Sequence, residues 1–181
     1  MGSRYNRQII NDHGYADFRL SVTWATCNVW GQADLRNTVT ILLGENYYGE
    51  NNCETYNKDI GDIDGTYLDV VHVKWGSPWR MPTCDEFQEL IDNCDYEWTE
   101  QNRVVAFKVM SKRIGKSIFL PAAGLRHLDV APLSGGHGYY WSFVLCVSGT
   151  QDADSLNFIS GYRCTYWFCL FNGHSVRPVS E

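Results

Sequence analysis

Aromatic residues are unevenly distributed along this sequence. The chain has 7 tryptophans, 11 tyrosines and 8 phenylalanines, and ten of these lie within residues 139–172. No lysine follows Lys116. A segment so aromatic and so poor in lysine suits either the buried half of a fold or an exposed binding face, because interaction hot spots have the same composition. The rest of the chain must therefore either cover this segment or display it.

The overall composition favours one globular domain. A chain of 181 residues with 44% hydrophobic and 20% charged residues can bury a core of its own. No apolar run reaches the roughly 18 residues that a membrane-spanning helix needs. The net charge of -6 lacks the positive excess that drives binding to nucleic acids. We therefore expect a single domain over residues 1–181, without membrane insertion and without a nucleic-acid partner.

Sequence signals for secretion and for catalysis are absent. Residues 1–7 lack the apolar stretch of a secretory signal, which leaves localisation open. The seven cysteines form no CxxC pair, and no phosphate loop, HExxH, GxSxG or EF-hand sequence occurs. Asp152 and Asp154 are expected on a polar turn between two strands, as solvated residues rather than catalytic acids. We expect no enzymatic activity, no cofactor and no metal.

One helix is predicted, over residues 83–94. Thr83 suits the N-cap position, and Glu86, three residues further on, suits the partner position of a capping box. Apolar side chains recur at helical spacing at Phe87, Leu90, Ile91 and Cys94. This helix should pack one face inward.

Short strand-like segments, separated by Gly, Asn and Asp turns, make up most of the remaining pattern. The expected strands are 18–24, 104–110, 117–120, 140–147, 155–159 and 175–179. Residues 44–65 are rich in Gly, Asn, Asp and Tyr and are expected to form an irregular loop. The predicted fold class is α+β, with small antiparallel sheets, at least one helix and long irregular loops.

Several sequence blocks occur together in a distinctive order. FRLSVTWATCNV at 18–29 is followed by WGSPWRMPT at 75–83, and then by SIFLPAAG at 117–124. The last two blocks are YWS at 140–142 and GHSVRPV at 173–179. Together they resemble the C-type-lectin-fold domains abundant in gut Bacteroidetes and their phages, a fold related to that of the formylglycine-generating enzyme. Some members of that group are the variable proteins of diversity-generating retroelements, in which adenine-directed mutagenesis rewrites a C-terminal segment.

The resemblance implies a C-type lectin-like domain with a variable segment at about 125–172. Arg177 and its neighbours would close the carboxyl end against the core, while the last strands carry changeable side chains on a solvent-facing surface. Relatives often have Ser or Asn within this segment, whereas here the positions hold a mixture that randomised asparagine codons would yield. Trp167 cannot be reached by that route, and Leu170 stands where relatives often have Arg.

The resemblance further implies a non-enzymatic protein that binds a ligand or receptor through this hypervariable surface. The expected ligand is a cell-surface protein or another macromolecule, and the expected location is a virion or a bacterial cell surface. Aromatic anchors would be buried on binding, and charged residues would add orientation and selectivity. The residues expected to form the surface are Phe143, Val144, Cys146, Asp152, Asp154, Asn157, Ile159, Tyr162, Arg163, Cys164, Tyr166, Trp167, Phe168, Cys169, Phe171 and Asn172.

Two alternatives remain open. One is a non-diversified structural or adhesive surface module of the same fold, whose C-terminal aromatics only pack. The other is a copper-dependent thiol oxidase, because Cys164 and Cys169 are five residues apart, a spacing also found in the active site of the formylglycine-generating enzyme. That activity needs the two thiols at bonding distance, whereas we expect that they do not converge.

A variable surface also needs a fixed core beneath it. Strand alternation would place Leu156 and Phe158 on a buried face, and Ser155, Asn157 and Ile159 on an exposed one. The residues expected to supply the core of the C-terminal segment are Trp141, Leu145, Ala153, Leu156, Phe158, Val176 and Pro178. The tripeptides with which C-type lectins bind calcium do not occur, so no calcium site is expected.

Overall fold

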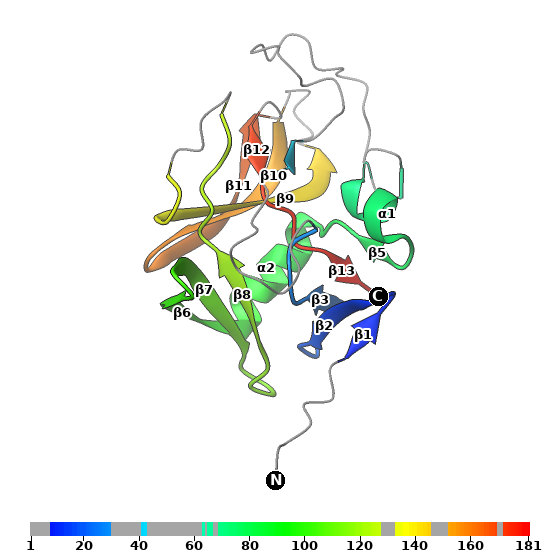
Figure 1. The fold of residues 1–181 in the computed structure, drawn as a ribbon, viewed down its shortest axis with the longest axis horizontal. Coiled ribbons are helices and arrows are strands. Elements are labelled where there is room, and N and C mark those ends of the chain that lie inside the picture. The colour runs from blue at the N-terminus through cyan, green and yellow to red at the C-terminus, as the bar shows by residue number, and fades with distance from the viewer. Residues whose placement is uncertain are drawn as a thin grey trace.

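The computed structural model of the chain describes residues 8–29, 41–42, 63, 65–66, 69–127, 133–145, 152–169 and 172–181. These residues form helices α1 (Val70–Trp75) and α2 (Cys84–Asn93) and a set of small antiparallel sheets (Figure 1). The expected α+β class with few helices is therefore confirmed. The loop predicted at 44–65 lies almost entirely outside the described residues.

The strands of the described residues fall into four sheets. The five-stranded sheet has the order β1 (Ile9–Ile10), β2 (His13–Asp17), β3 (Thr23–Ala25), β13 (Val179–Ser180) and β5 (Trp79–Arg80). One three-stranded sheet contains β6 (Cys94–Gln101), β7 (Val104–Ser111) and β8 (Ser117–Pro121). The other has the order β11 (Tyr162–Cys169), β10 (Asp152–Ile159) and β9 (His137–Leu145). The fourth pairs β12 (Gly173–His174) with β4 (Ile41–Leu42).

Strand pairing joins the two ends of the chain. β13 lies between β3 and β5, and Val179 is opposite both Trp24 and Arg80. In Figure 1 the red C-terminal strand accordingly lies beside the blue N-terminal strands. The last residues are therefore part of the main fold and not an appended tail.

Several strand predictions are confirmed, and others need correction. Strands were correctly expected at 104–110, 117–120 and 155–159. The segment 18–24 is strand only from Thr23, because Arg19 has a φ of 61°, which interrupts extended backbone. The segment 175–179 is strand only at its end, since Pro178 has no N–H to donate to a ladder. The strand expected at 140–147 corresponds to β9, which begins earlier, at His137. The elements that the sequence patterns missed are α1, β1, β2, β4, β5, β6, β11 and β12.

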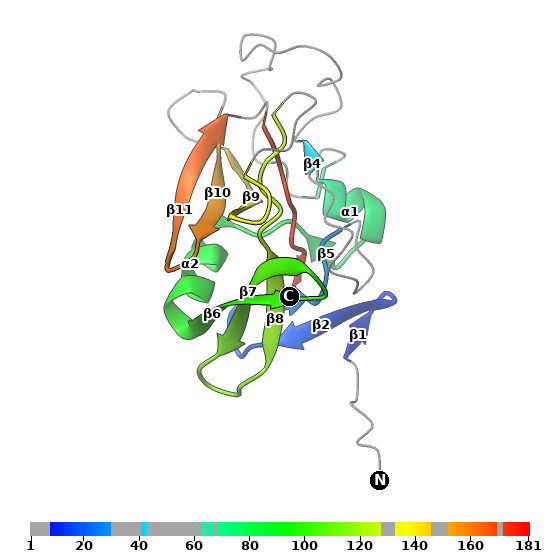
Figure 2. The ribbon, with the colours of Figure 1, turned by 60° about the vertical axis from the view of Figure 1, so that its left-hand side comes forward.

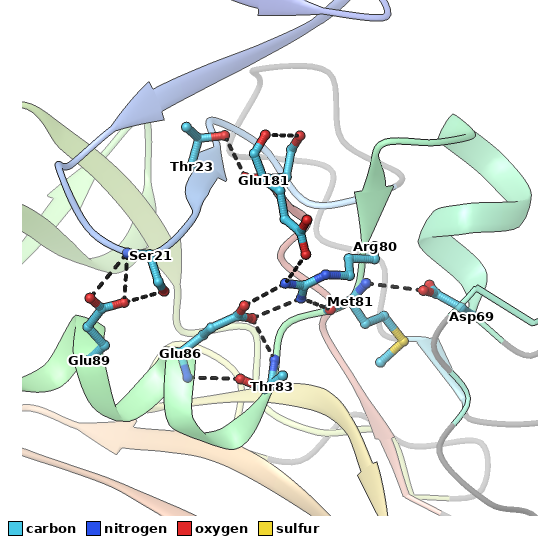
Figure 3. A network of polar contacts seen from close by, with 10 residues as sticks. Ser21, Thr23, Asp69, Arg80, Met81, Thr83, Glu86, Glu89 and Glu181 are labelled. Carbon is cyan, nitrogen blue, oxygen red and sulfur yellow. Dashed lines mark hydrogen bonds and ion pairs between the residues drawn. The ribbon is translucent and has the colours of Figure 1, made fainter.

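The predicted helix forms as α2, and its capping box is confirmed. The Thr83 hydroxyl accepts a hydrogen bond from the Glu86 N–H at 3.0 Å, and the Glu86 carboxylate accepts one from the Thr83 N–H at 2.8 Å. Glu86 also forms an ion pair with Arg80 of β5, at 2.6 Å (Figure 3). One side chain thus caps α2 and ties it to the five-stranded sheet. Phe87 and Leu90 supply the buried face of this helix.

Two hydrophobic clusters occupy opposite faces of the β9–β11 sheet. The first contains Tyr140, Leu156 and Phe158 together with Phe87 of α2 and Phe107 of β7. The second contains Trp75, Trp79, Met81, Trp141 and Val176. Successive strand residues point to opposite faces, so Tyr140 and Trp141 enter different clusters. The β9 side of the sheet is therefore covered on both faces.

Phe158 packs on this sheet against a glycine. Gly138 is its register partner on β9, and a Cβ atom at Gly138 would overlap the Phe158 ring. The same ring lies 5.0 Å from the Phe107 ring, centroid to centroid. The absence of a side chain at Gly138 is therefore what lets Phe158 lie flat against β9.

Arg177 closes the carboxyl end of the chain, as expected. Its side chain is buried, and its guanidinium donates hydrogen bonds to the carbonyls of Ala25, at 2.9 Å, and Phe119, at 2.6 Å. Burial lowers the pKa of Arg177, because the charged form loses its hydration. This one side chain therefore links the C-terminal segment to the N-terminal strands and to β8.

We expect Arg177→Lys to lower the free energy of unfolding by about 1.5–3 kcal/mol, because lysine cannot reach both buried carbonyls with the fixed guanidinium geometry. The matched control is Arg113→Lys, since Arg113 donates to the Arg19 carbonyl at 2.9 Å in an exposed position. That substitution should cost less than about 0.5 kcal/mol. Urea denaturation measures both values, and equal losses would contradict the role given to Arg177.

Candidate ligand-binding surface

Exposed apolar side chains gather on the β10–β11 hairpin. Among the described residues the large exposed ones include Ile159 (39% exposed), Tyr162 (58%), Tyr166 (51%) and Trp167 (46%). The other four, Ile9, Val73, Ile114 and Leu133, lie on separate elements or loops. We call Ile159, Tyr162, Tyr166 and Trp167 the hairpin surface. Among the described residues, the β10–β11 hairpin thus carries several large exposed apolar side chains close together in the chain.

The hairpin surface lies at the edge of its sheet. β10 and β11 pair in an unbroken antiparallel register from Asp152 opposite Cys169 to Ile159 opposite Tyr162. Within the described residues β11 pairs only with β10, and Figure 2 shows it on the outer side of the sheet. Edge strands leave one row of side chains and backbone groups accessible to a partner.

Neighbouring aromatic rings support the exposed ones. The Tyr166 and Trp167 rings stack with centroids 5.0 Å apart, and Tyr166 meets Phe168 edge to face at 6.0 Å. Phe168 in turn contacts His174 at 5.2 Å, and His174 stacks on Trp141 at 3.8 Å. A continuous row of rings therefore leads from the surface into the second cluster, which restrains the exposed side chains before any partner binds.

His174 was not predicted as part of this row. Burial lowers its pKa well below the ordinary value, so the imidazole is neutral at physiological pH. Its Nδ1 is hydrogen-bonded to the Ser155 hydroxyl at 3.0 Å. Sequence reasoning could not find this pair, because residues 155 and 174 are brought together only when the C-terminal segment pairs beside β9.

The structure corrects the expected alternation along β10. Leu156 and Phe158 are buried and Ile159 is exposed, as expected, but Ser155 is fully covered and Asn157 is half-buried. The His174 side chain covers the face on which Ser155 lies, since its Nδ1 is hydrogen-bonded to the Ser155 hydroxyl and its ring stacks on Trp141. On this face of β10, side-chain exposure therefore increases from Ser155 through Asn157 to Ile159, toward the hairpin turn. The whole face is not exposed.

The core residues expected beneath the surface are mostly confirmed. Those that the structure describes are buried, namely Trp141, Ala153, Leu156, Phe158, Val176 and Pro178. Nothing is described of the Leu145 side chain.

The polar turn expected at Asp152 and Asp154 is wrong. Both residues belong to β10, where Asp152 is opposite Cys169 and Asp154 is opposite Trp167. Asp152 is buried in this ladder, so it does not contribute to a surface. Asp154 is half-buried, and its pKa is raised, first by burial and second by the nearby carboxylate of Asp85.

The remaining expected surface residues are only partly accessible. Phe143 and Phe168 pack against the second cluster, and the Arg163 guanidinium lies 4.0 Å from the centre of the Tyr96 ring on β6. These residues hold the hairpin to the body of the protein. Val144, Asn157, Cys164, Cys169 and Asn172 are half-buried, and Cys146 and Phe171 lie outside the described residues.

The two cysteines of the copper alternative do not converge, as expected. Cys164 and Cys169 lie on one regular strand, and their odd separation points them to opposite faces. The Cys164 thiol donates to the Asn157 side-chain oxygen at 3.4 Å. Among the described residues there is also no group of three or more His, Cys, Asp or Glu side chains that could hold a metal ion.

Comparisons with protein families, characterised proteins and solved structures found no match to this chain. Within the described residues no helix has the length and apolar character needed to cross a membrane.

The raised pKa of Asp154 predicts how the free energy of unfolding depends on pH. The folded state disfavours the carboxylate form of Asp154. The ionised side chain therefore lowers the free energy of unfolding at pH values above the pKa that Asp154 has in the folded protein. This loss of stability disappears as the pH falls through that pKa. Asp154→Asn should therefore raise the free energy of unfolding at pH 7 and give no gain at about pH 3. Chemical denaturation at both pH values is the measurement.

Asp95→Asn is the control for this experiment, because Asp95 is exposed on β6. Its effect should stay within about 0.5 kcal/mol at either pH. A stability loss in Asp154→Asn at pH 7 would show that the Asp154 carboxylate is stabilised by its surroundings.

Proposed function

We propose that this chain is a non-enzymatic binding protein of the C-type lectin fold, of the kind diversified by retroelements, and that the hairpin surface contacts its partner. The observation that carries the proposal is the gathering of four large exposed apolar side chains on one hairpin. Tyrosine and tryptophan at such positions are typical anchors of protein interfaces, since they bury much area for little loss of side-chain freedom.

The burial pattern along β10 supports a fixed scaffold that displays exchangeable side chains. Leu156 and Phe158 are completely buried on β10, whereas Ile159 on the same strand is exposed. Side chains at the turn end of the hairpin can therefore change without disturbing the core. The pairing of β3 with β13 and the buried position of Arg177 agree with the closed ends that the family resemblance implies.

Some observations favour the alternative of a non-diversified structural or adhesive module. Phe143 and Phe168 pack against the second cluster, and Asp152 is buried, so these positions serve the scaffold. Sequencing the DNA beside the gene separates the two functions. A near-identical template repeat with a reverse transcriptase would support diversification, and the absence of both would favour the alternative.

The binding proposal is tested by replacing Tyr162, Tyr166 and Trp167 together by Ser. Because these side chains are about half exposed, the melting temperature should fall by no more than about 5 °C. A phage library of random 12-residue peptides serves as the probe. The unmodified protein should enrich binding peptides, and the triple variant should bind none of them.

The matched control replaces Ile9, Val73 and Ile114 by Ser, three apolar residues with similar exposure on other parts of the molecule. This variant should keep the binding of the enriched peptides. Peptides that bind both triple variants as well as the unmodified protein would contradict the proposal, and unfolding of the hairpin variant would show that its aromatics belong to the core.

A further inference from the structure

Negative charge is concentrated beside the hairpin. Residues 84–101, which form α2 and β6, contain seven carboxylates and no lysine, arginine or histidine. Figure 2 shows α2 lying under β11 and β10. Four of the carboxylates have partners, since Glu86 pairs with Arg80, Glu97 pairs with Lys108, Glu89 accepts from Ser21 and Asp92 accepts from Gln88. The surface next to the hairpin thus has an excess of negative charge.

A carboxylate of the hairpin itself lies beside the exposed indole. Asp154 lies directly across the ladder from Trp167, where side chains are neighbours on the same face of the sheet. Asp85, in the first turn of α2, is close enough to raise the pKa of Asp154. In the described part of the chain, no lysine or arginine lies within ion-pair distance of Asp154 or Asp85.

Within the described residues, the hairpin supplies no cation that neutralises this pair. Arg163 is the one basic residue in the sequence of β10 and β11, and its guanidinium lies against the Tyr96 ring. No lysine follows Lys116 in the sequence. The exposed Trp167 indole, which stacks on Tyr166 and lies opposite Asp154 on the ladder, therefore has no cation over its ring within the part of the chain that the structure describes.

We propose that the partner is a protein whose basic segment places a lysine or arginine side chain against the Trp167–Tyr166 stack, within reach of the carboxylates of Asp154 and Asp85. This inference rests on the proposed function and specifies the chemistry of the partner. A cation over the face of tryptophan is attracted by the negative charge of the ring face. Carboxylates around the same group add charge-assisted hydrogen bonds and select against acidic partners.

Two double variants, which each remove two negative charges, test whether the carboxylates beside the indole bind the partner. Asp85→Asn with Asp154→Asn removes the two carboxylates beside the indole. Asp92→Asn with Asp95→Asn removes the same charge from the acidic region, at positions on α2 and β6. The first pair should fold normally, since burial already disfavours the charged form of Asp154.

The experiment begins with the peptides that the unmodified protein selects from the random 12-residue library. They should be enriched in lysine and arginine, and a synthetic copy of the dominant peptide should bind the Asp85/Asp154 variant at least about tenfold more weakly. The Asp92/Asp95 variant should bind it within about twofold, because charges at a distance are screened by salt. Binding is measured by calorimetry at physiological ionic strength.

The outcomes separate this inference from the proposed function. Selected peptides without basic residues, whose binding is lost in the Tyr162/Tyr166/Trp167 triple variant, would overturn the cationic partner and leave the hairpin surface intact. Equal weakening by the two aspartate pairs would also overturn it, since the attraction would then come from the whole acidic region. Peptides unaffected by the triple variant, or no enrichment at all, would contradict both proposals.

Discussion

Tyr140 and Trp141 are neighbours on β9, and each is completely buried in a different hydrophobic cluster. This is possible only where a strand is covered on both faces. The β9–β11 sheet therefore separates α2 and the β6–β8 sheet on one side from α1, Trp79 and Val176 on the other. Arg177 fixes the second layer by bonding to Ala25 and Phe119, so the position of β9 depends on both ends of the chain.

The proposed binding surface lies where the sheet is no longer covered on both faces. Residues 138–142 of β9 are buried, most of β10 is covered, and β11 is the least covered strand, with Tyr162, Tyr166 and Trp167 exposed. Phe168 and His174 connect the stacked rings of Tyr166 and Trp167 to Trp141 in the interior. A partner would therefore meet aromatic side chains that are already held in place, which reduces the entropy lost on binding.

Local sequence patterns predicted the parts of the fold that local interactions determine. The capping box of α2 is set by Thr83 and Glu86, three residues apart, and β7 and β8 have clear apolar patterns. β6 was missed because it follows α2 directly and is mostly polar. Ser155 and Asp152 were misplaced because their burial depends on strands and segments distant in the sequence. The same limit applies to Asp85 and Asp154, which only the packing of α2 on the hairpin brings together.

The central claim is that one strand carries both core and displayed side chains, and Phe158 and Ile159 test it at consecutive positions. Phe158 lies against Gly138 and Phe107, while Ile159 is 39% exposed at the hairpin turn. Chemical denaturation should show that Phe158→Ala lowers the free energy of unfolding by about 3–5 kcal/mol and that Ile159→Ala changes it by less than about 0.5 kcal/mol. Similar losses in the two variants would contradict the division of β10 into a buried scaffold and a displayed surface.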